Sequence, residues 1–174
     1  MLHVMTALPA DISALMRSDK TLGATPKWDE KSDSRYFSIL HPLIISGLTV
    51  GGLELRLKVS KQHAARDALM QIEYSQSGRR SATALVRIDW KPFHTHPSIT
   101  GTLTGSHEHG FEDNYLSHEN RMRSGSLPKA TPLDPDPDTV SDFLALCGSK
   151  FRITDIAVIR IPARPGDLFW TKNG

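Results

Sequence analysis

The feature of this chain that most constrains its fold is the segment Leu53–Val59, where apolar and charged residues alternate without interruption. Side chains of a β-strand point alternately to the two faces of a sheet. The alternation therefore predicts a strand with one buried and one solvated face. The same period of two returns at Met70–Tyr74 and at Ala84–Trp90. A short turn around Gly78 would join these two segments as an antiparallel pair.

One helix is expected before these strands and one after them. Apolar residues at helical spacing predict a short amphipathic helix at Pro9–Ser18. After the strands, Asp138 or Thr139 is suited to cap a second helix, which Gly148 would end. Cys147 lies on the apolar face of this second helix, so we expect it to fill the core.

Three further segments complete the expected layout. Tyr36–Ile45 is predicted as a strand, and Pro42 places it at a sheet edge or a bulge. Ile156–Ile161 is predicted as a last strand. Arg123–Thr139 is rich in proline and aspartate and is expected to form an exposed, flexible loop. The sum is an α+β fold: a central antiparallel sheet with an N-terminal helix and a C-terminal-half helix packed on it.

Length and composition narrow the class of protein. The length of 174 residues fits one domain, 1–174, with its core at about 36–161. The 21 Lys and Arg nearly balance the 19 Asp and Glu, so overall charge gives no reason to expect a nucleic acid or a membrane partner. The single cysteine cannot form an internal disulfide, which favours a cytoplasmic location. No signal peptide or membrane-spanning segment is expected.

Histidines are concentrated in one part of the chain. Two His-x-His pairs, His94 with His96 and His107 with His109, are separated by ten residues that include two glycines. On extended backbone both imidazoles of a pair share one face. The intervening loop could fold the second pair over the first, so that up to four imidazoles converge. His118, the fifth histidine of this region, is expected at the surface.

Two kinds of chemistry suit such a cluster. Imidazole is a ligand for Zn, Cu, Fe or Ni, and Glu112 or Asp113 could complete a metal shell. Histidine also serves in general acid–base catalysis without any cofactor, because its ordinary pKa of about 6.5 lies near neutral pH. The spacing alone does not choose between a divalent metal site (Zn, Fe or Ni) and a metal-free site. A structural interpretation also stays open, in which the histidines are merely exposed or hydrogen-bonded and bind nothing.

Several runs resemble the pattern of an uncharacterised family of small bacterial proteins. In that family a strand ending in Leu-Arg-Leu-Asp leads to His-Thr-Asn-Pro-x-Gly and then to Pro-His-x-His-x-Tyr-x-Glu-Gly-Tyr-x-Asp-Lys-Trp. The matching runs here are Leu85-Val-Arg87-Ile-Asp89, His94-Thr-His96-Pro97 and Ser106-His107-Glu-His109-Gly-Phe-Glu112-Asp113. His96 stands where the family has Asn. The resemblance covers residues 36–150 and extends, more distantly, to TumE-type toxins, which are associated with RNA-directed toxicity.

The small-protein family has no assigned activity, but the more distant similarity to TumE-type toxins, together with the clustered histidines, implies a toxin-like ribonuclease that cleaves RNA. His94 and either His107 or His109 would then be the acid and the base, with Glu112 or Asp113 orienting an imidazole. The arginines just upstream would hold phosphate oxygens; they are Arg79, Arg80 and Arg87. The structural alternatives are a solvated hairpin turn for the first two and an ion pair with Asp89 for the third.

Whether the chain is an enzyme stays open at this point. The ribonuclease is the first functional hypothesis, and a metal-binding enzyme is the second. The third is a non-enzymatic interaction protein of a phage or mobile element. The partners to expect are RNA in the first case and a cognate antitoxin or another protein in the last, with no membrane in any of them.

Overall fold

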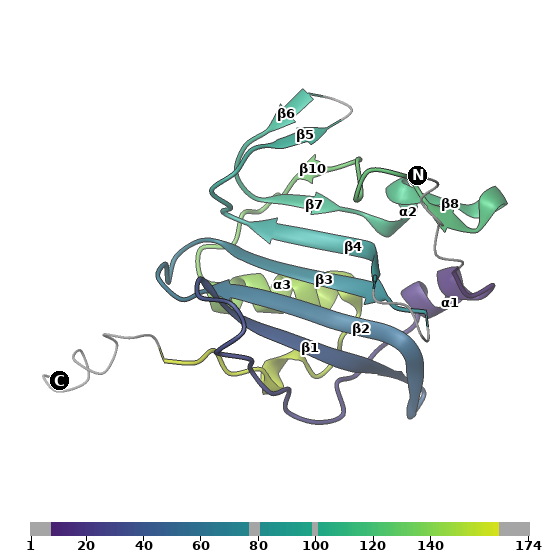
Figure 1. Ribbon diagram of the computed structural model, residues 1–174, viewed down its shortest axis with the longest axis horizontal. Helices are drawn as coiled ribbons and strands as arrows, with labels where there is room; N and C mark the ends of the chain where they lie inside the picture. Colours follow the sequence, from purple (N-terminus) through teal and green to yellow (C-terminus); the bar gives the residue numbers. More distant parts are fainter. Residues whose placement is uncertain (1–7, 77–80, 99–100, 164–174) are drawn as a thin grey trace, which may run out of the picture.

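The computed structural model describes residues 8–76, 81–98 and 101–163, and it has an α+β fold (Figure 1). A six-stranded antiparallel sheet has the order β1-β2-β3-β4-β7-β10. These strands are β1 (Tyr36–Ile45), β2 (Leu48–Ser60), β3 (Ala68–Tyr74), β4 (Thr83–Trp90), β7 (His107–His109) and β10 (Thr131–Pro132). Two smaller antiparallel pairs are β5 (His96–Ser98) with β6 (Gly101–Leu103), and β8 (Tyr115–Leu116) with β9 (Arg121–Met122).

The helices are short apart from one. They are α1 (Ile12–Arg17), α2 (Phe111–Asn114) and α3 (Val140–Phe151), with two 3₁₀ turns, η1 (Ser117–Glu119) and η2 (Ile156–Val158). Within the described parts of the chain, no helix is long and apolar enough to cross a membrane.

The four long strands follow the predicted alternation. In β2 the apolar residues from Leu53 to Val59 are almost completely buried, while the charged residues between them are partly exposed. β1 has the predicted bounds and lies at the sheet edge, and its register with β2 shifts between Pro42 and Ile44. β3 and β4 pair antiparallel as expected. The turn predicted around Gly78 lies outside the described residues.

One face of the sheet is covered by α3, which lies behind the middle strands in Figure 1. Trp90 of β4 stacks on Phe143 of α3, with ring centroids 5.7 Å apart. Cys147 is buried in this layer, as predicted, and burial raises the pKa of its thiol. We call the face covered by α3 the back face and the opposite face the front face. The hydrophobic core therefore occupies the back face.

The second helix does not end where the sequence predicts. Thr139 caps it, but α3 continues past Gly148 to Phe151, and Arg152 provides the left-handed residue after its end. Gly148 is needed for close packing instead, because a Cβ there would come within 2.5 Å of the Ile156 side chain. At the other end of the chain, α1 is shorter than predicted and begins at Ile12 rather than at Pro9.

Two further predictions need correction. The strand predicted at 156–161 is wrong: residues 156–158 form the 3₁₀ turn η2, residues 159–161 are irregular, and the turn packs on α3. The proline-rich segment 123–139 is irregular and mostly exposed, as predicted, but a few of its side chains anchor it to the core. Leu127, Ala130 and Leu133 are buried, and β10 within it pairs with β7. Apolar residues three apart, rather than overall composition, decide how this segment packs.

Candidate functional site

The register of β4 against β7 places four polar side chains on the front face. Ile88 and Trp90 belong to the core on the back face, so Arg87 and Asp89, which alternate with them, point forward. Arg87 pairs with His109 and Asp89 pairs with His107. Because neighbouring strands are about 5 Å apart, the side chains of each pair can touch. Both histidines are fully buried, and Asp89 is 4% exposed.

The other histidine pair reaches the same place through the turn after β4 and the β5–β6 hairpin. The turn is fixed by a positive φ at Lys91, whose N–H donates to Ser106 Oγ. The ring centroid of His96 then lies 4.5 Å from that of His109 and 5.4 Å from that of His107. The exposed His94 ring is 6.4 Å from His107. The two His-x-His pairs therefore come together, which the sequence left open: His96, His107 and His109 form one group, and His94 forms a second group with His107 and Asp89. We call the four histidines with Asp89 the histidine cluster.

Two backbone carbonyls set the proton positions of the buried rings. His107 Nδ1 lies 2.8 Å from the Gly105 carbonyl oxygen, and His109 Nδ1 lies 2.7 Å from that of Leu127. A carbonyl oxygen can only accept, so each Nδ1 carries the proton and donates. In a neutral ring this leaves Nε2 as an acceptor that faces the cluster. The Leu127 contact comes from the segment 123–139, which therefore closes one side of the site.

Two nitrogens of the cluster lack hydrogen bonds. His96 Nε2 and His107 Nε2 are buried and have no hydrogen-bond partner among the described residues. Oδ2 of Asp89 lies 3.3 Å from His107 Nε2, but a carboxylate and a neutral imidazole Nε2 are both acceptors. Their approach is favourable only when a proton or another cation is present between them.

Asp89 is the anionic centre of the cluster. Its Oδ2 accepts a hydrogen bond from Arg87 Nε at 2.7 Å and lies 3.4 Å from His109 Nε2. Burial acts to raise the pKa of Asp89, but its contacts with His107, His109 and Arg87 lower it well below the ordinary value. Asp89 is therefore ionised. The predicted alternative for Arg87, an ion pair with Asp89, is what the structure contains.

The two groups that differ most in their surroundings are His96 and His107. Burial lowers the pKa of His96, and the positive neighbours His109, His107 and Arg87 lower it further. Burial also acts to lower the pKa of His107, but the contacts with Asp89 and the Gly105 carbonyl outweigh it, and the net shift is upward. The lowered pKa means that His96 favours the neutral form of its imidazole. The raised pKa means that His107 favours the protonated, positively charged form more than a free histidine does.

The cluster has the dimensions of a metal site. One potential ligand atom from each of His96, His107 and His109 lies within 4.8 Å of the others, and the same holds for Asp89, His94 and His107. Tetrahedral Zn²⁺ with bonds of about 2.0–2.1 Å holds its ligand atoms about 3.4 Å apart. Small rotamer movements would close this difference. A buried His/Asp group that could hold a metal ion is therefore present.

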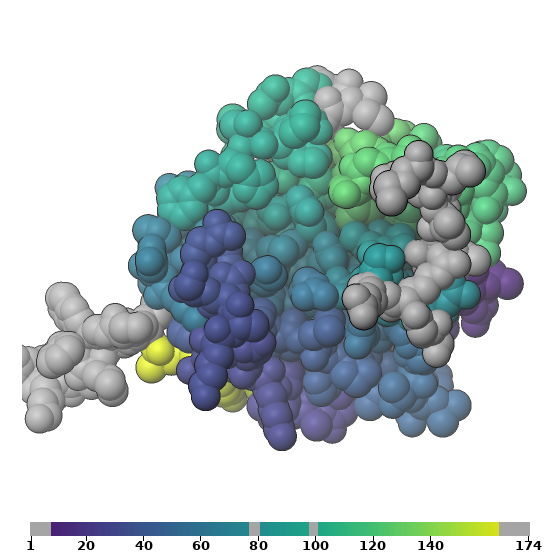
Figure 2. All heavy atoms as spheres, viewed as in Figure 1, coloured from purple at the N-terminus to yellow at the C-terminus, as the bar shows by residue number. Residues whose placement is uncertain are grey.

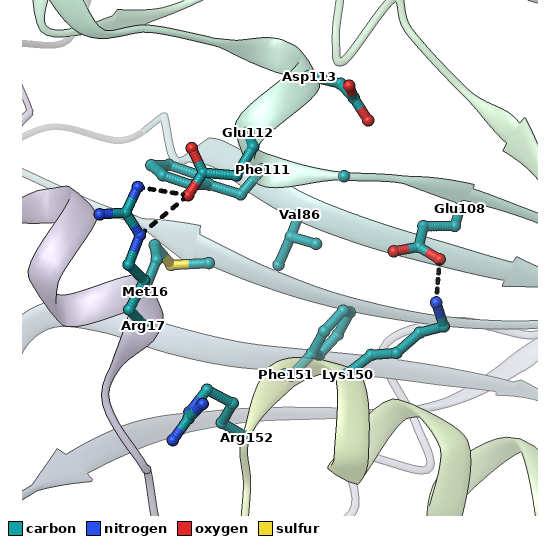
Figure 3. Close-up of a pocket in the computed structure, with 11 residues that line it drawn as sticks. Met16, Arg17, Val86, Glu108, Phe111, Glu112, Asp113, Lys150, Phe151 and Arg152 are labelled. Atoms are coloured by element: carbon teal, nitrogen blue, oxygen red, sulfur yellow. Dashed lines mark hydrogen bonds and ion pairs between the residues drawn. The ribbon is translucent and has the colours of Figure 1, made fainter.

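The structure does not bring Glu112 and Asp113 to the imidazoles. Glu112 Oε1 pairs with Arg17 at 2.9 Å, and both side chains are exposed. Both acidic residues line a cavity of about 380 Å³ on the back face, between α1, α2 and the end of α3 (Figure 3). The sequence predicts that Glu112 or Asp113 orients an imidazole. In the structure, Asp89 and two backbone carbonyls have this role instead.

The remaining predicted residues lie away from the cluster or outside the described part. Arg79 and Arg80 are outside the described residues. His118 is a surface residue, as expected, beside Glu119. Asp89 is the site residue that sequence reasoning missed, although its period-two relation to Arg87 was a signal that both share a face. Comparisons with protein-family models, with curated proteins and with solved structures found no match to this chain.

Proposed function

We propose that this protein is a metalloprotein that binds one divalent transition-metal ion, with Zn²⁺ the best fit, through His96, His107 and His109. The observation that carries the proposal is the pair of buried ring nitrogens without hydrogen-bond partners among the described residues. Leaving a buried polar atom unpaired costs about 1–3 kcal/mol. Coordination would remove this cost for His96 Nε2, and it would give His107 Nε2 a cation in place of the proton that the ring otherwise shares with Asp89.

The surroundings of the rings support the same proposal. Ligand histidines usually donate their second ring N–H to a carbonyl or a carboxylate, which fixes the ring and its tautomer. Gly105 and Leu127 provide this support for His107 and His109. Asp89, held by Arg87, supplies a negative charge beside the site. Three imidazoles and one carboxylate suit Zn²⁺, Fe²⁺ or Ni²⁺ better than Mg²⁺ or Ca²⁺, which prefer oxygen ligands.

The open side of the cluster is the side of His94. This ring is exposed, whereas His107, His109 and Asp89 are buried, so a substrate would approach past His94. A bound divalent metal ion would polarise a carbonyl or phosphoryl oxygen as a Lewis acid. His94 is placed to exchange a proton with a substrate held there. A hydrolytic reaction is the class that these parts favour.

The direct test is the metal content of protein produced without a histidine tag. We expect about one equivalent of a transition metal by elemental analysis, and tight binding of added Zn²⁺ to the metal-free protein by calorimetry. His107→Ala removes a buried ring and can affect folding, so the partly exposed His96→Asn is the second variant. Both should lose most of the metal, whereas the surface variant His118→Ala should retain it. Substoichiometric metal in the wild type, or equal content in all variants, would overturn the proposal.

Metal-free cleavage of RNA is the second candidate. Its support is the contact of Asp89 with both His107 and His109 and the position of His94 beside them. Arg87 forms an ion pair with Asp89, so Arg87 is not available to hold a phosphate. Cleavage of total RNA that persists in a chelator and is lost in His94→Ala would favour this candidate over the metal site.

A further inference from the structure

A second cavity, of about 390 Å³, lies beside the histidine cluster on the side of His94. His94 belongs both to this cavity and to the group that it forms with Asp89 and His107. The rest of the lining comes from the start of β1, the β2–β3 connection and the turn after β4; it includes Arg35, Tyr36, Gln62, His63, Asp67 and Phe93. The volume is within the range of small-molecule sites. In Figure 2 the segment that precedes β1, in dark blue, stands against the front of the molecule.

One wall of this cavity is aromatic and is held in place. Phe93 is 56% exposed, and its ring meets that of His63 edge to face, with centroids 4.8 Å apart. The Arg66 guanidinium lies 3.7 Å from the centre of the Phe93 ring and donates to the carbonyls of Lys91 and Pro92. These contacts fix an aromatic ring that remains half in solvent. Arg66 covers one face of the ring, so a flat heterocycle would stack on the opposite face.

Another part of the lining carries a guanidinium that forms no salt bridge with the described residues. The Arg35 guanidinium lies 5.5 Å from the centre of the Tyr36 ring, and no carboxylate of the described residues forms an ion pair with it. By contrast, Arg56 and Arg87 are each bound by a carboxylate. A free guanidinium binds phosphate through two parallel hydrogen bonds.

Polar groups between the aromatic wall and Arg35 can recognise the edge of a ligand. The Tyr36 hydroxyl donates to Asp67 at 2.8 Å, which fixes this carboxylate at the cavity. The Gln62 side chain is exposed and offers both a donor and an acceptor. A carboxylate and an amide suit the amino and hydroxyl groups of a base or a ribose.

We infer that this cavity binds a nucleoside monophosphate unit, with its base against Phe93 and its phosphate at Arg35. A molecule in the cavity would contact the histidine cluster through His94. The cavity is then the substrate pocket of the metal site, and this second statement rests on the proposed function. The unit can be a free nucleotide or part of an RNA strand, since the ring and the phosphate are the same in both.

Calorimetric titration with four probes tests this inference: adenosine 5′-monophosphate, adenosine, inorganic phosphate and a short single-stranded RNA. The monophosphate should bind more tightly than adenosine or phosphate. Phe93→Ala should weaken the monophosphate and adenosine about tenfold without affecting phosphate. Arg35→Gln should weaken the monophosphate and phosphate about tenfold without affecting adenosine. Tighter binding of the RNA than of the monophosphate would identify a strand as the source of the unit, and weaker binding would identify the free nucleotide.

Matched controls separate this inference from the metal proposal. Two control variants lie outside the proposed cavity. Arg17→Gln changes an exposed arginine of the back-face cavity, and Leu48→Ala changes an apolar residue that is 73% exposed. Neither should alter binding of any probe. Metal content is measured for every variant and should be unchanged in Phe93→Ala and Arg35→Gln. Metal without nucleotide binding would overturn the inference alone, as would equal affinities in wild type and both variants. Nucleotide binding through Phe93 and Arg35 without metal would overturn the proposed function alone.

Discussion

Lys20 is a fully buried lysine whose ammonium group binds backbone carbonyl oxygens at the end of a helix. Its Nζ donates to the carbonyl oxygens of Met16 and Ser18, at the end of α1. Such carbonyls have no donor within the helix. Burial lowers the pKa of Lys20 to about 8, with a further lowering by Arg152 and an opposing effect of Asp19. The folded protein therefore holds this proton less tightly than the unfolded chain does.

This difference predicts a pH dependence of stability. Between the folded pKa of about 8 and the unfolded value of 10.5, the unfolded chain binds more protons, so the free energy of unfolding rises with pH. We expect Lys20 to contribute a rise of about 2 kcal/mol between pH 8 and 10. Urea unfolding of wild type and Lys20→Met at both pH values measures it. The difference between the two proteins cancels other groups, such as Tyr36 and Cys147. Parallel pH profiles would contradict the assignment.

The residues of the site show what a sequence can and cannot reveal at this scale. The spacing of the His-x-His pairs indicates which imidazoles of a pair can share a face, but it leaves open whether the loop between the pairs brings them together, which it does. The spacing did not reveal which carboxylate joins them. Glu112 is near His109 in sequence but sits on a helix that turns it toward Arg17, whereas Asp89 arrives through strand pairing. Pairing between distant segments is not encoded in local spacing.

At the scale of elements, α3 depends on its first turn. Thr139 Oγ1 accepts from the Asp142 N–H, and the Asp142 carboxylate accepts from the Thr139 N–H, so two helix-end donors are satisfied. Thr139→Ala should lower the free energy of unfolding by about 1 kcal/mol. Ser141→Ala, an exposed change in the same turn, is the control. Denaturant unfolding that places both variants at wild-type stability would show that the cap is not needed.

Elements with a regular pattern were predicted better than those whose shape depends on tertiary contacts. The bounds of β1 and the alternation of β2 follow from apolar periodicity alone. Residues 123–139 have no period of two that would mark a strand. Their place is fixed by Leu127 and Leu133 entering the core and by the carbonyl of Pro137 accepting from Trp90 Nε1. Residues 156–161 are apolar like a strand, but the outer edge of β1 forms its bridges with Thr21 and Asp29 instead, and the turn at 156–158 packs on α3.

At the scale of the whole molecule, the two faces of the sheet have different roles: one packs the hydrophobic core and the other carries the candidate site. The back face carries the core under α3, while the front face carries the histidine cluster and the cavity beside it. One strand, β4, serves both faces, with Ile88 and Trp90 behind and Arg87 and Asp89 in front. A rigid core directly behind the cluster holds its residues in place, which a metal site requires.

The central claim is that His96, His107 and His109 together hold one metal ion. X-ray absorption spectroscopy of the zinc-loaded protein tests it most directly, because it reports the type, number and distance of the atoms bound to the metal. We expect three imidazole nitrogens at about 2.0–2.1 Å from the zinc in the wild type, and two around the zinc that His96→Asn still binds when zinc is in excess. A first shell without imidazole nitrogens, or one that is the same in wild type and His96→Asn, would contradict it.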